Sequence, residues 1–245
     1  MSAPVLLITG GSRGIGAATA KLAARKGYDV ALSYVRDQAS ADAVAAEIRA
    51  TGRRAVAIQA DVSREEDITR LFAEVDTKLG VLDVLVVNGG VNGRPYRLAD
   101  APASQIREVI DVNVTGAILC AREGVRRMST RHGGKGGSIV LVSSRVTDYG
   151  SPGEFVWYAA SKGAINAFCV GLAREVGREG IRVNAVSPGP IDTEMLSESR
   201  RASINEVVPM ARIGKPEEVG EAILFLASPA ASFTTGANIS VSGGR

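Results

Sequence analysis

The sequence predicts an α/β protein with a doubly wound parallel sheet of seven strands and helices on both of its faces. Short aliphatic runs such as Val5–Ile8 alternate with amphipathic stretches along the whole chain, and this alternation is typical of parallel sheets. The runs are apolar at nearly every position, which is expected where both faces of a sheet are buried. Because there is no internal repeat or linker, we expect residues 1–245 to form a single domain.

The predicted strands are the short aliphatic runs, at residues 5–8, 29–34, 54–59, 81–87, 137–143, 181–187 and 238–241. The predicted helices are the amphipathic stretches, at residues 17–26, 39–51, 63–80, 103–130, 156–178 and from 216 onward. Ser63 and Glu66 have the spacing of a capping box, and Pro216 suits the first position of a helix. Residues 188–208 break the alternation, so we expect a substrate loop or lid there.

Charge and composition give little support to nucleic-acid binding. The formal net charge is only +3 over 245 residues, too small an excess to indicate a polyanion partner. The densest basic stretch comprises Arg122, Arg126, Arg127, Arg131 and Lys135. We expect most of these side chains to lie on one solvated helix face, and a polyanion site is the alternative.

Metal, hydrolase and membrane functions are not indicated either. Cys120 and Cys169 are far apart and have the apolar surroundings of core residues. The sole histidine, His132, lies in a loop, so neither a metal site nor a Ser-His-Asp centre is expected. No signal peptide or apolar run of about 20 residues is present, and we expect a cytoplasmic protein without a membrane partner.

A glycine-rich turn follows the first predicted strand and opens the first predicted helix. It reads Thr9-Gly10-Gly11-Ser12-Arg13-Gly14-Ile15-Gly16. Glycines permit a tight turn and a close approach to a ligand, and a helix N-terminus offers free N–H groups to a phosphate. In this strand–turn–helix setting the motif predicts a Rossmann dinucleotide site, with contacts from Gly10, Ser12, Arg13, Gly14, Ile15 and Gly16.

Tyr158 and Lys162 are four residues apart in a predicted helix, so both side chains lie on one face. Together with the Thr-Gly-x-x-x-Gly-x-Gly turn, this pair resembles the short-chain dehydrogenase/reductase family over essentially the whole chain. The resemblance implies hydride transfer between a nicotinamide cofactor and a small carbonyl compound or secondary alcohol. It also implies a homotetramer, in which residues 236–245 resemble an ordered interface tail.

Four positions match the catalytic set that the resemblance implies. Ser144 would hydrogen-bond the substrate carbonyl, with Ser143 as a rival, and Tyr158 would donate the proton. Lys162 would bind the nicotinamide ribose and lower the pKa of Tyr158. Asn113 would steady a water and a proton path behind the lysine.

Further cofactor contacts are also implied by resemblance. Asp61 and Val62 match an adenine-binding pair, and Pro188 and Gly189 match a segment beside the nicotinamide. Additional matching positions are Asn88, Gly89, Ile191 and Thr193, where Gly89 replaces the usual alanine and Ile191 and Thr193 would contact the carboxamide.

The end of the second strand favours NADP(H) over NAD(H). The position typical of an acid that binds the ribose holds Ser33 or Tyr34. Arg36 and Arg13 flank the expected place of a 2′-phosphate. The alternative is that Arg36 is merely solvated and that Asp37 reaches the ribose.

The substrate stays open at this level. Resemblance does not separate 3-oxoacyl-carrier-protein reductases from sugar dehydrogenases, and a polar or anionic carbonyl compound is as compatible with the sequence as a lipid. An NADP(H)-sensing regulatory protein or a nucleotide-binding methyltransferase would also carry a glycine-rich turn after the first strand. The presence of both Tyr158 and Lys162 favours the enzyme over the sensor, and a methyltransferase would not need Ser144.

Overall fold

Seven parallel strands form one sheet in the order β3-β2-β1-β4-β5-β6-β7 in the computed structural model, which describes residues 3–194, 201 and 206–245. The strands are β1 (Val5–Ile8), β2 (Asp29–Tyr34), β3 (Ala55–Gln59), β4 (Leu82–Val87), β5 (Gly137–Val142), β6 (Ile181–Pro188) and β7 (Asn238–Val241). Each strand lies within one residue of its predicted bounds. The doubly wound parallel sheet predicted from the sequence is therefore confirmed.

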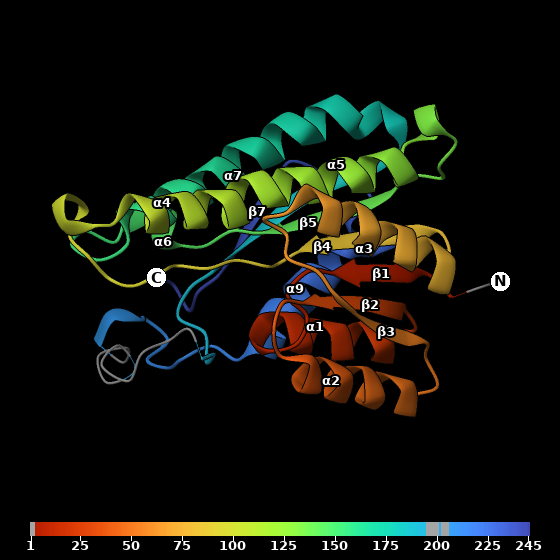
Figure 1. The fold of residues 1–245 in the computed structure, drawn as a ribbon, viewed down its shortest axis with the longest axis horizontal. Helices are drawn as coiled ribbons and strands as arrows, with labels where there is room; N and C mark the ends of the chain where they lie inside the picture. Colours follow the sequence, from red (N-terminus) through yellow and green to blue (C-terminus); the bar gives the residue numbers. More distant parts are fainter. Residues whose placement is uncertain (1–2, 195–200, 202–205) are drawn as a thin grey trace.

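Helices cover both faces of this sheet, as Figure 1 shows. One face carries α3 (Glu65–Lys78), α4 (Ala103–Ile110), α5 (Ala117–Met128) and α7 (Val156–Val176). The other face carries α1 (Gly14–Arg25), α2 (Gln38–Ala50) and α9 (Pro216–Ala227). A short helix, α6 (Val146–Tyr149), follows β5. Pro216 is the first residue of α9, as predicted.

Alternate residues of each strand enter two separate hydrophobic cores. In β1, Val5 and Leu7 pack in the core beneath α3, α5 and α7, whereas Leu6 and Ile8 pack beneath α1, α2 and α9. All four side chains are almost completely buried. This double burial explains why the strand is apolar at every position, because successive side chains point to opposite faces.

The predicted helix over residues 103–130 is interrupted. A π-helical turn, Asp111–Gly116, separates α4 from α5. Gly116 lies so close to the loop after β3 that a Cβ there would be 2.3 Å from the main-chain oxygen of Val62. Such wide turns are frequent at functional sites, and this one carries Asn113.

Two other helix starts differ from the sequence-based expectation. The capping box of Ser63 and Glu66 is wrong: α3 begins at Glu65, and the Ser63 hydroxyl donates to Asp61 Oδ1 at 2.7 Å. Asp67 instead accepts the main-chain N–H of Asp61 at 2.9 Å. The first helix begins at Gly14 rather than at Ala17, so its first turn belongs to the glycine-rich loop.

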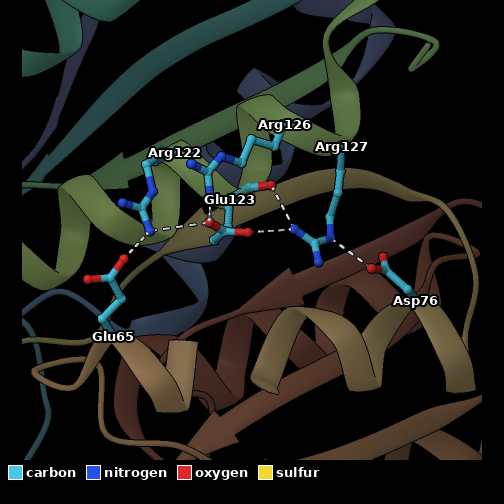
Figure 2. A network of polar contacts seen from close by, with 6 residues as sticks. All are labelled: Glu65, Asp76, Arg122, Glu123, Arg126 and Arg127. Carbon is cyan, nitrogen blue, oxygen red and sulfur yellow. Dashed lines mark hydrogen bonds and ion pairs between the residues drawn. The ribbon is translucent and has the colours of Figure 1, made fainter. Parts of the chain in front are cut away.

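The basic stretch on α5 is held in an ion-pair network rather than simply solvated (Figure 2). The buried carboxylate of Glu123 pairs with three arginines of its own helix, Arg122, Arg126 and Arg127. Arg122 also pairs with Glu65, and Arg127 pairs with Asp76, so the network joins α5 to α3. Burial alone would raise the pKa of Glu123, but its arginine partners outweigh burial and hold the pKa below its usual value. Their charge is thus largely matched within the protein.

Both cysteines are buried core residues, as predicted. Within residues 3–194, 201 and 206–245, no group of three His, Cys, Asp or Glu side chains is arranged to hold a metal ion. In the same ranges no helix has both the length and the apolar character needed to cross a bilayer.

Replacing Gly116 by alanine tests the close contact at the π-helical turn. We expect the free energy of unfolding to fall by about 2 kcal/mol, because the new methyl group meets main chain that cannot move aside. The matched control is Gly171→Ala in α7, where a Cβ meets nothing within 4 Å. That change removes a helix glycine and should stabilise the protein by about 0.5–1 kcal/mol. Urea unfolding measures both, and equal effects would refute the packing argument.

Candidate active site

A cavity of about 800 Å³ opens at the carboxyl ends of the strands, next to the point between β1 and β4 where the strand order reverses. Open α/β sheets bind ligands at this position. The predicted cofactor residues all line it: Gly10, Ser12, Arg13, Gly14, Ile15, Gly16, Arg36, Asp61, Val62, Asn88, Gly89, Tyr158, Lys162, Pro188, Gly189, Ile191 and Thr193. Ser144 lines the same cavity, whereas Asn113 does not.

The glycine-rich loop has the shape that its sequence predicts. Gly10 and Gly14 have positive φ angles of 63° and 53°. A Cβ on Gly16 would lie 2.1 Å from the main-chain oxygen of Gly10, so no other residue fits there. A Cβ on Gly14 would lie 3.2 Å from Cγ2 of Thr193, which places the segment after β6 directly over the loop.

The N-terminus of α1 suits a diphosphate. Its cap residue, Arg13, makes no side-chain capping hydrogen bond, and the first turn contains no acidic residue. The N–H groups of this turn are therefore available to an anion, and the helix dipole favours negative charge there. This chemistry and the glycine cradle both fit a dinucleotide.

Asn88 clamps the glycine-rich loop to the end of β4. Its side-chain amide donates to the carbonyl oxygens of Thr9 and Gly10, each at 3.0 Å. The Thr9 hydroxyl accepts the N–H groups of Asn88 and Gly89, also at 3.0 Å. An alanine at position 89 would make only ordinary contacts, so the unusual glycine does not alter this clamp. Sequence reasoning expected Asn88 at the cofactor but missed its bonds to Thr9.

The end of β2 carries an arginine that has no ion pair with any described residue. Ser33 is buried, and its hydroxyl accepts the N–H of Gly10 at 3.1 Å. Asp37 caps α2 by accepting the N–H and the hydroxyl of Ser40. Arg13 forms an exposed ion pair with Glu194 at 2.9 Å, an interaction that contributes about 1 kcal/mol or less. Arg36 is exposed and has no ion pair in the described part of the chain.

The remaining predicted contacts lie after β3 and β6. Asp61 accepts both the N–H and the hydroxyl of Ser63. Gly189 donates to the carbonyl of Val241 at 2.9 Å. Ile191 packs its side chain in the hydrophobic core, so only part of this residue faces the cavity. Of the expected lid at residues 188–208, residues 195–200 and 202–205 lie outside the described residues.

Ser143 and Ser144 both line the cavity, but their hydroxyl groups differ in burial and in partners. Ser143 is buried, and its hydroxyl donates to the main-chain oxygen of Lys162 at 3.2 Å. The Ser144 hydroxyl accepts the N–H of Val146 and is hydrogen-bonded to Tyr158. The hydroxyl of Ser143 is thus engaged with the main chain, whereas that of Ser144 lies beside Tyr158 and is the better placed of the two to meet a substrate.

Burial dominates the protonation of Tyr158 and Lys162. It raises the pKa of Tyr158 to about 12, although the hydrogen bond with Ser144 acts in the opposite direction. Burial lowers the pKa of Lys162 to about 8, and its ammonium donates to the carbonyl of Val142 at 2.8 Å. Lys162 Nζ lies 5.8 Å from the centre of the Tyr158 ring. Without cofactor, Lys162 therefore does not lower the pKa of Tyr158, and the lowering expected with the positively charged oxidised nicotinamide bound stays a prediction.

Asn113 stands behind the cavity wall rather than in it. Its side chain exchanges two hydrogen bonds of 2.8 Å with the main chain of Val91 and donates to the Ser161 hydroxyl at 3.0 Å. Ser161 in turn donates to the carbonyl oxygen of Tyr158 at 2.7 Å. Asn113 thereby connects the loop after β4 to the helix that carries Tyr158 and Lys162. No signal in the sequence identified Ser161.

Comparison with known proteins agrees with this geometry. The sequence model of a family described as "Enoyl-(Acyl carrier protein) reductase" matches residues 10–245. An "uncharacterized oxidoreductase" of Escherichia coli is 44% identical, covering 98% of this chain and 99% of that protein. A 3-oxoacyl-[acyl-carrier-protein] reductase of Synechocystis is 38% identical, covering 100% of this chain and 97% of the relative. A solved short-chain dehydrogenase from Burkholderia cenocepacia in complex with NADP superposes with a TM-score of 0.93 at 35% identity, covering 99% of this chain and 98% of that one.

Because the pKa of Lys162 is lowered, the difference in stability between the wild type and the Lys162→Met variant should depend on pH in the absence of cofactor. Folded Lys162 loses its proton near pH 8, whereas the unfolded side chain keeps it to about 10.5. Above pH 8 the unfolded state therefore binds more protons, and the wild type gains stability as pH rises. Relative to the methionine variant, the gain between pH 7 and 11 should be about 3 kcal/mol.

Denaturant unfolding of both proteins at a series of pH values measures this difference. Tyr158→Phe serves as the control from pH 7 to 10, where it should parallel the wild type, because the raised pKa of Tyr158 affects stability only above pH 10. Parallel pH profiles for the wild type and Lys162→Met would contradict the assignment.

Proposed function

Because the chain belongs to the short-chain dehydrogenase/reductase family, we propose that it uses NADP(H) to interconvert a carbonyl compound and a secondary alcohol. One observation carries the proposal: Ser144, Tyr158 and Lys162 line the same cavity as the glycine-rich loop. A substrate beside these side chains would therefore also lie beside a dinucleotide held by that loop. The nicotinamide ring, when bound, supplies or accepts the hydride.

Each cavity residue has one role in this scheme. In the reducing direction Ser144 donates a hydrogen bond to the carbonyl oxygen, on which negative charge develops. Tyr158, already hydrogen-bonded to Ser144, gives its proton to that oxygen. Lys162 would bind the ribose hydroxyls. They would accept hydrogen bonds from its buried ammonium, which also donates to the carbonyl of Val142. The positive charge of Lys162 and of the oxidised nicotinamide would then favour the Tyr158 phenolate.

Asn113 acts as a positioning residue. All three of its side-chain hydrogen bonds go to Val91 and Ser161, so its amide has little capacity left for a water. A water behind Lys162 would instead be bound by the main chain of the π-helical turn, where the regular pattern of helix hydrogen bonds is broken.

Selection of NADP(H) over NAD(H) rests on the end of β2. NAD sites present a carboxylate to the ribose 2′-hydroxyl, whereas NADP sites present an arginine to the 2′-phosphate. Asp37 is engaged in capping α2, and Ser33 is engaged with Gly10. The exposed Arg36 is free of ion pairs among the described residues. The NADP complex of the Burkholderia relative is consistent with the same choice.

The substrate is a small carbonyl compound, and the likeness to the Synechocystis protein makes a 3-oxoacyl thioester one candidate.

A homotetramer is also part of the proposal. Ile118 on α5 and Val170 on α7 are exposed apolar side chains, which a neighbouring subunit would cover. Light scattering tests the assembly, and a monomeric mass would refute it.

Tyr158→Phe removes only the hydroxyl group that gives the proton. We expect turnover to fall about 10³-fold, with NADPH binding retained, as followed by NADPH absorbance and by fluorescence titration. Tyr28→Phe, far from the cavity, is the control. Turnover within about tenfold of the wild type, a barrier change of only about 1.4 kcal/mol, would exclude Tyr158 as the acid. If wild-type protein binds NADPH but reduces no ketone, ketoacyl thioester or aldose, a sensor function is favoured over catalysis.

Arg36→Gln tests the choice of cofactor. A charge-assisted hydrogen bond to the 2′-phosphate is worth about 1.5–3 kcal/mol, so the KM for NADPH should rise roughly 10- to 100-fold. The KM for NADH, which lacks this phosphate, should change less than about twofold. Arg25→Gln, another exposed arginine, is the control. A wild type that prefers NADH would overturn the assignment.

A further inference from the structure

Arg245 lies in the cavity, over the ring of Tyr149. The guanidinium carbon is 4.7 Å from the centre of the ring, and both residues line the cavity together with Ser144 and Tyr158. Stacking on an aromatic face stabilises a guanidinium and leaves its in-plane N–H groups free to bind another group. The sequence alone gave no reason to place Arg245 near the site.

Two glycines turn the chain from β7 towards the cavity. Gly243 and Gly244 both have positive φ angles, 65° and 96°. A Cβ at Gly243 would lie 2.7 Å from Val208, and one at Gly244 would lie 3.0 Å from Pro209. Residues 243–244 therefore pass against residues 208–209, and Figure 1 shows the C-terminus beside α6.

The active-site loop itself holds Arg245 in place. Arg145, which directly follows Ser144, donates through Nε to the main-chain oxygen of Arg245 at 2.8 Å. The same arginine forms an ion pair with Asp148 of α6 at 2.7 Å. Tyr149 ends α6 and supplies the stacking surface. The side chain of Arg245 is thus fixed to the segment that carries Ser144.

The guanidinium of Arg245 carries a charge that the described residues do not match. No ion pair or hydrogen bond joins this group to any residue in ranges 3–194, 201 and 206–245. Of the other cations lining the cavity, Arg13 pairs with Glu194 and Lys162 donates to Val142. Arg36 follows β2, three strands away from β5 in the sheet. Within the described residues, Arg245 is therefore an arginine on the Ser144 side of the cavity whose guanidinium has no acidic partner.

Tyr149 and Tyr158 line the same cavity. Tyr149 ends α6, and α6 packs against α7, the helix that carries Tyr158. A group bound by the N–H fork of Arg245, above Tyr149, would thus be within one small molecule's length of Tyr158.

We propose that the carbonyl substrate carries a carboxylate, and that Arg245, stacked on Tyr149, binds it. The planar fork of a guanidinium matches the two oxygens of a carboxylate. Glu108 also lines the cavity and would repel an anion, which favours binding of the carboxylate at Arg245 instead. The reaction would convert an oxo acid, NADPH and a proton to a hydroxy acid and NADP⁺. This inference rests on the proposed function.

A paired substrate series tests the proposal. The probes are 4-oxopentanoate, 5-oxohexanoate and 4-oxocyclohexanecarboxylate, each beside its neutral primary amide. For the wild type we expect kcat/KM to be at least about tenfold higher for one or more acids than for the matching amide. Arg245→Gln should remove this preference by raising the KM for the acid, while the KM for NADPH and the activity on the amide stay within about twofold. Arg245→Lys should restore part of it, and Arg25→Gln should behave as the wild type.

Equal use of acids and amides by the wild type, or an equal loss for both in Arg245→Gln, would overturn the proposal. The proposal would also be overturned if the enzyme preferred a charged substrate only in the case of dihydroxyacetone phosphate over dihydroxyacetone. The same holds if it reduced only an acetoacetyl thioester and Arg245→Gln left that activity unchanged.

A binding measurement separates this inference from the proposed reaction. With NADP⁺ bound, cyclohexanecarboxylate should raise the melting temperature of the wild type but not that of Arg245→Gln, and cyclohexanecarboxamide should have no such selective effect. If no carbonyl probe is reduced but this selective stabilisation is seen, the anion site stands and the proposed reaction fails. If the carboxylate stabilises neither protein, or both equally, the anion site is refuted.

Discussion

The site depends on one run of hydrogen bonds between the glycine-rich loop and the helix of the catalytic pair. Asn88 joins the loop to the end of β4 through Thr9 and Gly10. Three residues later, Val91 is bound to the Asn113 amide, which reaches the hydroxyl of Ser161 one turn from Tyr158. Buried amide networks of this kind fix a unique geometry, because a partly broken network leaves desolvated polar groups unpaired. The phosphate-binding and proton-donating parts of the cavity are thereby held in one arrangement.

Burial within this frame controls the charges of the site. Burial lowers the pKa of Lys162, whose ammonium donates to a carbonyl oxygen, and burial also raises the pKa of Tyr158, which keeps the phenol neutral. In such surroundings an added opposite charge or acceptor has a large effect, because water screens it poorly. Arg36 and Arg245, which have no acidic partner among the described residues, both line the cavity but lie apart: Arg36 follows β2, and Arg245 stacks on Tyr149 after β5, three strands away. In the proposed scheme each would bind a different ligand, Arg36 the cofactor and Arg245 the substrate.

Much of the site was predictable because its signals are local. The turn from Thr9 to Gly16 needs glycine for steric reasons that depend on a few neighbouring residues, and the spacing of Tyr158 and Lys162 places both on one helix face. Resemblance and spacing favoured Ser144 over Ser143, but the physical reason, the buried Ser143 hydroxyl bound to the main chain of α7, came only from the tertiary structure. The raised pKa of Tyr158 in the absence of cofactor was not predicted, because desolvation cannot be read from a motif.

Hydrophobic periodicity and glycine sterics act over short spans, and they were enough to specify the sheet, its helices and the loop that fits a dinucleotide. The π-helical turn at Asp111–Gly116, set by contact with Val62, and the place of Arg245 depend instead on how distant segments pack. Contacts such as that between Arg145 and Arg245 join residues 100 positions apart. No local pattern encodes them, because they exist only once β5, β6 and β7 lie side by side.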